Sequence, residues 1–217
     1  MQVIKIMRLK MAIHTIQLSR WSQVSILRHL ELRKLFLQQI EAELHAHLGT
    51  SKVIWLPRGV VNDETDGHID NFARFASPGV VMLTWTDDQD DPQYERSAEA
   101  LAILEKATDA QGRPLRVVKL LQPGPLHMTA EEADGVDAVP GSQPRAAGER
   151  LAGSYVNSYI GNGIVVLPLF DDPNDAAAVA AYEELFPGRR VLTVPGREIL
   201  LGGGNVHCVT QQQPSGR

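Results

Sequence analysis

Apolar residues recur at helical spacing in three stretches of the chain. In the first, at 32–48, leucines, a phenylalanine and an isoleucine follow the three- and four-residue spacing of a helix, and Gly49 comes next. This period marks one apolar helix face, and a glycine just past the last turn is a common helix end. Similar patterns predict two further helices, which begin near Pro92 and Pro173.

Short apolar runs alternate with these helices and predict strands. The runs lie at 52–57, 67–75, 80–85, 115–120, 154–160, 164–170 and 189–195. Ser-Pro-Gly at 77–79 and Gly-Asn-Gly at 161–163 predict turns that join neighbouring strands into hairpins. The stretch 122–149 is rich in proline, glycine and acidic residues, which indicates a long loop. Strands that alternate with helices place the chain in the α/β class.

Two stretches share one order of elements, which indicates an internal repeat. HIDNFARFASPGVVMLTWTDD and YVNSYIGNGIVVLPLFDD each predict strand, turn, strand and an Asp-Asp pair, and a helix and a strand follow both. This alignment places Asp70 opposite Asn157. Residues 32–56 then resemble the tail of an earlier unit, and 198–214 the head of a later one. The alternative is a chance likeness, since any α/β protein offers strand–helix–strand segments.

Composition and charge limit the kinds of molecule that this chain can be expected to bind. The chain has 217 residues, 43% of them hydrophobic, and a formal net charge of -5. This charge argues against nucleic acid, which requires a basic face, and no apolar run has the length of a membrane span. A single cysteine cannot form an internal disulfide, so we expect a reducing, cytoplasmic setting.

That cysteine, Cys208, lies in the stretch GGGNVHCVTQQQP. A thiol becomes nucleophilic where a cation or backbone N–H groups stabilise its thiolate, and glycines allow close approach to a ligand. His207 is adjacent, but neighbours along a strand point to opposite faces. The pattern therefore predicts that the base comes from elsewhere in the chain. The alternative is that Cys208 is a small buried apolar residue.

The stretch NDETDGHIDN, at 62–71, offers that base. In a strand His68 and Asp70 would share a face, and Glu64 would share it if the extended path continues. A histidine flanked by carboxylates can act as general acid and then base, and carboxylates match a planar guanidinium. A thiolate, a histidine and paired carboxylates are the groups that guanidinium hydrolysis needs.

Two other interpretations of this stretch remain open. One is a solvated acidic turn. The other is a metal site built from Asp63, Glu64, Asp66, His68 and Asp70. The spacing does not fit the twelve-residue calcium loop, and no second histidine or cysteine completes a zinc set. We expect no metal here.

These residues lie in longer stretches that resemble the agmatine deiminase family. The main ones are WLPRGVVNDETDGHIDNFARFASPGVVMLTWTDDQDDPQYERS and GGGNVHCVTQQQP, and RLAGSYVNSYIGNG and FPGRRVLTVPGREIL are also similar. The resemblance runs from about Leu35 to Pro214. It implies the pentein fold, an α/β propeller of five ββαβ-type units around a central site.

The resemblance also implies roles for four residues. Cys208 would be the nucleophile that forms an amidino-thioether with agmatine, and His68 the general acid and base. Asp70 would bind the guanidinium nitrogens, and Glu64 would assist. The implied reaction converts agmatine and water into N-carbamoylputrescine and ammonia, in putrescine synthesis, without a cofactor or metal.

The resemblance is partial, and the basic segment 1–33 has no counterpart in the family. Residues 34–217 would then form an incomplete pentein domain, with about three of the five units and without a second guanidinium-binding carboxylate. We expect a chain that is inactive alone, or one completed by a complementing chain or a homo-oligomer. Alternative functions are peptidylarginine or arginine deiminase, and a non-catalytic remnant that only binds.

Overall fold

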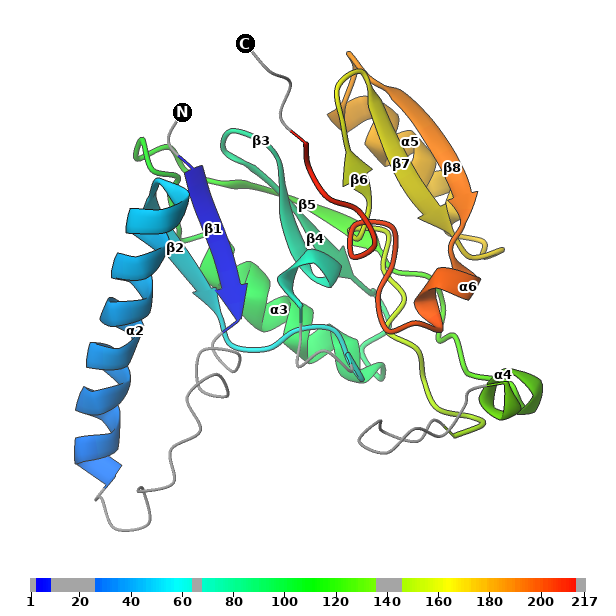
Figure 1. Ribbon diagram of the computed structural model, residues 1–217, viewed down its shortest axis with the longest axis horizontal. Coiled ribbons are helices and arrows are strands. Elements are labelled where there is room, and N and C mark those ends of the chain that lie inside the picture. The colour runs from blue at the N-terminus through cyan, green and yellow to red at the C-terminus, as the bar shows by residue number, and fades with distance from the viewer. Residues whose placement is uncertain (1–2, 9–25, 64–67, 136–145, 214–217) are drawn as a thin grey trace.

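The computed structural model describes residues 3–8, 26–63, 68–135 and 146–213. These residues form a mixed α/β protein with three small sheets (Figure 1). None of the helices within these ranges has both the length and the apolar character that a membrane span requires.

The first of the three sheets has two strands, and a helix leads into the second of them. Strand β1 (Val3–Arg8) and strand β2 (Thr50–Leu56) are parallel. Helix α2 (Ile26–Leu48) leads into β2 and begins earlier than the apolar pattern predicts. The helix ends at Leu48, as predicted. The next residue, Gly49, adopts a φ of 62°, a left-handed backbone conformation that residues with a side chain disfavour.

The first repeated unit, residues 68–121, is a three-stranded sheet with one helix. Its elements are the short helix η1 (Ile69–Asn71), β3 (Ala73–Ser77), β4 (Val80–Trp85), α3 (Pro92–Leu104) and β5 (Arg116–Leu121). Strands β3 and β4 form an antiparallel hairpin, and β5 pairs with β4 in parallel. The unit therefore has the predicted order strand, strand, helix, strand.

The second repeated unit, residues 154–195, has the same connections. Its elements are β6 (Tyr159–Ile160), β7 (Ile164–Leu169), α5 (Asp175–Leu185) and β8 (Arg190–Pro195). The hairpin β6–β7 is antiparallel and the pair β7–β8 is parallel. The short helix α4 (Ala130–Asp134) lies between the units, and α6 (Arg197–Leu200) follows the second. The repeat predicted from the sequence is confirmed in this order of elements.

The ladders show which residues of the two units correspond. Both parallel ladders begin with an arginine, at the first residue of β5 and of β8. From this common start, the hairpin registers place Asn157 at the position of Phe72, not of Asp70. The sequence alignment was therefore wrong by two residues. It treated both stretches as continuous strands, whereas η1 interrupts the first.

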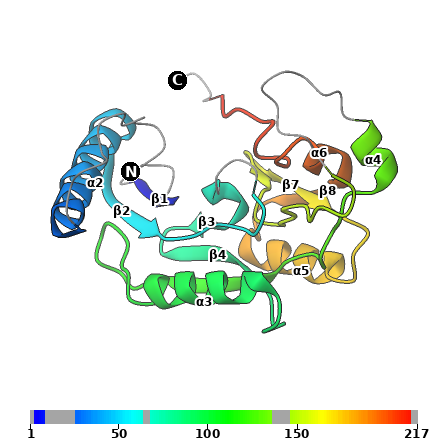
Figure 2. The same cartoon turned by 90° about the horizontal axis from the view of Figure 1, so that it is seen from below.

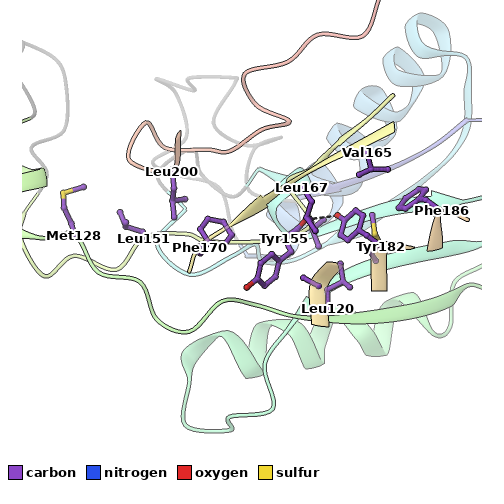
Figure 3. Close-up of a cluster of buried hydrophobic side chains, with 13 residues drawn as sticks. Leu120, Met128, Leu151, Tyr155, Val165, Leu167, Phe170, Tyr182, Phe186 and Leu200 are labelled. Atoms are coloured by element: carbon purple, nitrogen blue, oxygen red, sulfur yellow. Dashed lines mark hydrogen bonds between the residues drawn. The ribbon is translucent and has the colours of Figure 1, made fainter. Parts of the chain in front are cut away.

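Two apolar cores hold the units together. Alternate residues of a strand point to opposite faces, so Val81 and Leu83 of β4 pack with α3, while Met82 packs into the second core. Leu120 of β5 joins Met82 there (Figure 3). The second core is otherwise built from the second unit, from α6 and from Met128 and Leu151 between the units, so the sheet of strands β3, β4 and β5 contributes to both cores. The two units are thus packed as neighbours through buried apolar contacts.

The two repeated helices lie on one side of the sheets. Figure 2 shows α3 and α5 side by side along that side, with the C-terminal segment on the other. The functional side chains described below come from η1 and the residue before it, from the segment before β6 and from the turn after α6.

Several local predictions need correction. Within the described part of the predicted strand at 67–75, residues 69–71 form η1, and β3 begins only at Ala73. The predicted strand at 154–160 is reduced to β6. The predicted loop 122–149 contains α4, and the segment 201–209 forms turns instead of a strand head. Thr129 and Glu132 form a capping box at α4, a signal that was present in the sequence.

Candidate functional site

The candidate site lies where three segments meet. Asp70 comes from η1 of the first unit, Asn157 from the segment before β6 of the second, and Cys208 from the turn after α6. These residues are far apart in the sequence. The packing of the two units on each other therefore creates the site.

The sulfur of Cys208 has polar neighbours from both units. The thiol donates to Asp70 Oδ2 at 3.4 Å, and Asn157 Nδ2 donates to the sulfur at 3.1 Å. A Cβ atom placed on Gly204 would lie 2.7 Å from the sulfur, so only glycine fits there without a shift. The glycine-rich stretch thus makes room for the thiol itself.

Asp70 is the ionised centre of the site. Its Oδ2 lies 2.6 Å from His207 Nδ1, and its Oδ1 lies 4.0 Å from His68 Nδ1. Burial alone would raise the pKa of Asp70, but His207, Cys208 and His68 outweigh it, and the pKa lies below its usual value. Asp70 is therefore a carboxylate at neutral pH, ready to accept hydrogen bonds from a cation.

The thiol of Cys208 has the opposite tendency. Its burial raises the pKa, Asn157 offsets part of this by donating to the sulfur, and Asp70 raises the pKa further. The net pKa of Cys208 lies above the usual thiol value, so the thiol is protonated at neutral pH. A cation between the carboxylate and the sulfur would reverse this balance, because it favours the thiolate.

The structure brings together three of the four predicted site residues. His68, Asp70 and Cys208 each offer one donor atom within 4.8 Å of the others. Glu64 lies outside the described residues. The roles of all four residues remain predictions, and only the proximity of these three is observed.

His207 lies beside the site, although the sequence argument placed its side chain on the opposite face from Cys208. That argument assumed a strand, in which His207 and Cys208 would face opposite ways. The segment instead folds into turns, with Cys208 N–H donating to Asn205 C=O at 2.9 Å. The His207 ring therefore reaches Asp70, on the same side as the sulfur.

The same three side chains are the described residues that could hold a metal ion. Imidazole, carboxylate and thiolate are ligands that zinc accepts. The sequence argument found no cysteine or second histidine close to this stretch, because Cys208 lies far along the chain. A carboxylate beside a thiol also offers the acceptors that a planar cation needs.

A buried polar network fixes the segment that leads to His68. Gln93 of α3 is fully buried, and its Oε1 accepts the Val61 N–H at 2.9 Å. Asp91 caps α3 and binds Arg150 through two hydrogen bonds of 2.8 and 2.9 Å. Arg150 C=O in turn accepts from Asn62 Nδ2 at 3.5 Å. The start of the acidic stretch is thus fixed from both α3 and the inter-unit segment.

Comparison with known proteins shows that this chain matches a protein family. The model of the Porphyromonas-type peptidyl-arginine deiminases matches residues 25–214. The chain is 59% identical over 179 residues to the agmatine deiminase of Pseudomonas aeruginosa (strain UCBPP-PA14), covering 82% of this chain and 49% of that protein. It is 54% identical over 190 residues to the agmatine deiminase of Pseudomonas fluorescens (strain Pf-5), covering 88% and 52%.

A solved structure agrees with these relatives. The agmatine deiminase of Enterococcus faecalis, solved while catalysing its reaction, superposes with a TM-score of 0.76 at 39% identity. The superposition covers 82% of this chain and 48% of that protein. The chain thus spans about half the length of the relatives that it matches.

Proposed function

The chain belongs to the family of Porphyromonas-type peptidyl-arginine deiminases, and we propose that it carries the cysteine half of an agmatine deiminase site. The observation that carries the proposal is the contact of the Cys208 thiol with the ionised Asp70. The choice of agmatine is supported by the name of relatives at 54 to 59% identity.

Asp70 would bind the guanidinium group of the substrate. A carboxylate accepts two parallel N–H bonds from this planar cation, which places the central carbon near the sulfur. Arrival of the cation would also lower the pKa of Cys208, because its charge offsets the effect of Asp70 on the thiolate. Substrate binding would thereby generate the nucleophile.

The chemistry would proceed in two halves. The thiolate attacks the guanidinium carbon, His68 protonates one nitrogen, and the C–N bond breaks to release ammonia. Neutral His68 then takes a proton from water, which adds to the amidino carbon. The C–S bond breaks and its electron pair returns to sulfur. The proton left on the new hydroxyl passes to that thiolate, which restores the thiol, and N-carbamoylputrescine leaves. The sum is agmatine plus water giving N-carbamoylputrescine and ammonia, a step toward putrescine.

Further parts of the proposal concern the rest of the site. We infer that residues 34–217 correspond to about three of the five units of a pentein propeller. Glu64 would assist Asp70. The remaining units would come from sequence outside this chain, from a complementing chain or from a homo-oligomer. The chain alone would then bind weakly and turn over slowly.

A product assay tests this proposal. Purified chain is incubated with agmatine, arginine or benzoyl-arginine amide, and the ureido product is measured, with Cys208→Ala as control. The proposal predicts turnover of agmatine that disappears in the control. Turnover of arginine or the peptide analogue in preference to agmatine would favour arginine or peptidylarginine deiminase. A folded chain without turnover of any of the three would be a non-catalytic remnant.

A further inference from the structure

Asn157 is the contribution of the second unit to the site, and it is fully buried. Its Nδ2 donates to Cys208 Sγ at 3.1 Å and to Asn71 Oδ1 at 2.6 Å. Its Oδ1 accepts the backbone N–H of His207 at 2.9 Å. One amide group thus holds both the reactive sulfur and the turn on which the sulfur is carried.

The orientation of this amide is determined by its partners. A rotation by 180° would place Asn157 Oδ1 against Asn71 Oδ1, and the NH₂ group against the His207 N–H. Both contacts would be repulsive, because an acceptor would face an acceptor and a donor a donor. The N–H that faces the sulfur is therefore fixed in place before any substrate arrives.

The neutral amide suits a buried donor to sulfur. A lysine or arginine at this position would stabilise a thiolate more strongly, but it would be costly to bury and would repel a cationic substrate. An amide N–H carries no charge, and it forms a stronger hydrogen bond with a thiolate than with a thiol. Asn157 therefore favours the reactive form of Cys208 without occupying the place of the cation.

We propose that Asn157 is a further catalytic residue, whose Nδ2–H holds the Cys208 sulfur both when it attacks and when it leaves. The contact is observed, and its part in the two halves of the reaction rests on the proposed function. In the second half the C–S bond breaks and the electron pair returns to sulfur. The N–H of Asn157 receives that developing negative charge and so assists departure of the thiolate.

Asn71 acts as the positioning residue for this amide. It is buried, its Oδ1 takes the second N–H of Asn157, and its backbone C=O accepts the Thr84 hydroxyl at 2.8 Å. Asn71 is thus tied to β4, so the position of the Asn157 amide depends on the sheet of strands β3, β4 and β5. Its own Nδ2 is one of the buried polar atoms without a hydrogen-bond partner in the described part of the chain. The residue therefore serves Asn157 through its oxygen alone.

The rate at which iodoacetamide alkylates the protein, measured against pH, tests the proposal. Cys208 is the only cysteine, so a single midpoint is observed. Asn157→Leu, of similar size, removes the N–H without adding a charge and should raise the midpoint by about one pH unit. Asn71→Ala also changes no charge and should raise it by a smaller amount. The exposed Asn162 of the second unit provides the matched control, and Asn162→Leu should leave the midpoint unchanged.

A purely structural asparagine would give a different result. Thermal unfolding of Asn157→Leu would then shift, while the alkylation midpoint of the folded variant would equal that of the wild type, and this would overturn the proposal. If Asn157→Leu does not fold, an unchanged midpoint in folded Asn71→Ala overturns it. Iodoacetamide needs no bound substrate. A midpoint that depends on Asn157 in a chain without agmatine turnover would uphold the contact with sulfur and reject the proposed function.

Discussion

The two repeated units, 68–121 and 154–195, share a backbone plan but supply different chemistry. Each has a hairpin, a helix and a parallel third strand that begins with arginine. The first unit gives the sulfur a carboxylate, Asp70, which is partly exposed, and the second gives it an amide, Asn157, which is fully buried. A charge must stay near solvent or a partner, whereas a neutral amide can be buried once its hydrogen bonds are made.

The aspartates that precede the helices of the two units also bind different partners. Asp91 precedes Pro92 and Asp172 precedes Pro173, and each accepts a backbone N–H two residues ahead, at 2.8 Å. Beyond this shared turn, Asp91 binds the Arg150 side chain, while Asp172 accepts the backbone N–H of Gly124. The comparison teaches that the repeat fixes local turns, and that the second partner of each carboxylate is specific to its unit.

The largest expected effect follows from removing the charge of the first unit. In a protein that turns over agmatine, Asp70→Asn should lower kcat/KM by about 10² to 10³, because the cation loses its carboxylate. The same change should lower the pKa of Cys208, since Asp70 raises it. The opposite variant Asn157→Asp adds a negative charge on the other side of the sulfur and should raise the pKa of Cys208. Asp70→Asn with unchanged kcat/KM would show that the carboxylate does not bind the substrate.

The ion pair between Asp91 of the first unit and Arg150 of the inter-unit segment should contribute most to stability. Asp91 and Arg150 are 5% and 16% exposed at their side chains. Removing one member of a buried pair leaves the other charge uncompensated, so Arg150→Ala should lower the free energy of unfolding by about 3 kcal/mol. Urea denaturation measures this, with the exposed Arg116→Ala as control. Equal effects of both substitutions would show that the pair adds nothing beyond an exposed arginine.

The same pair predicts a dependence of stability on pH. Burial would raise the pKa of Asp91, but Arg150, Gln93 and Gln122 outweigh it, and the net pKa lies below the usual 3.8. A carboxyl group with a lowered pKa contributes stability above its unfolded pKa, and this is lost as pH falls through the folded value. Urea midpoints measured from pH 6 downward should therefore fall less steeply below 3.8 in Arg150→Ala than in the wild type. Parallel curves would contradict this.

The smallest expected effect concerns the short hairpin of the second unit. The hydroxyl of Tyr182 is fully buried and donates to Tyr155 C=O at 2.7 Å, and burial raises its pKa to about 12. Tyr182→Phe leaves that carbonyl with one partner fewer and should cost about 1 kcal/mol. Tyr94→Phe, on the partly exposed face of α3, is the matched control for the loss of a hydroxyl. A Tyr182→Phe protein as stable as the control would mean that this hydrogen bond between α5 and the segment before β6 adds no measurable stability.

The order of elements was predictable from the sequence because it depends on local signals. Apolar period, Gly49 and the turn glycines placed the helices and hairpins within a few residues. The side-chain contacts of the site were harder to predict. Asn157 meets Asn71 and Cys208 across 86 and 51 residues. Such contacts depend on how the two units pack, which no local pattern encodes.

Two errors about the site share one physical cause. Both the alignment of Asp70 with Asn157 and the dismissal of His207 assumed extended strands. In the structure η1 and the turn at 205–210 replace them, and a turn places neighbouring side chains on one side. His68 and Asp70 nevertheless lie close together, so that part of the prediction had the right outcome for the wrong local geometry. Polar residues near glycines are where the assumption of a strand fails.

The central claim is that this chain alone assembles the thiol and carboxylate into a site for a planar cation. The direct test compares alkylation of Cys208 by chloroacetamidine, which is cationic, with alkylation by neutral chloroacetamide. The ratio of the two rates, divided by the same ratio for glutathione, should exceed about ten, which corresponds to about 1.4 kcal/mol. This ratio relative to glutathione should fall toward one in the Asp70→Asn variant. A ratio equal to that of glutathione in the folded wild-type chain would contradict the account.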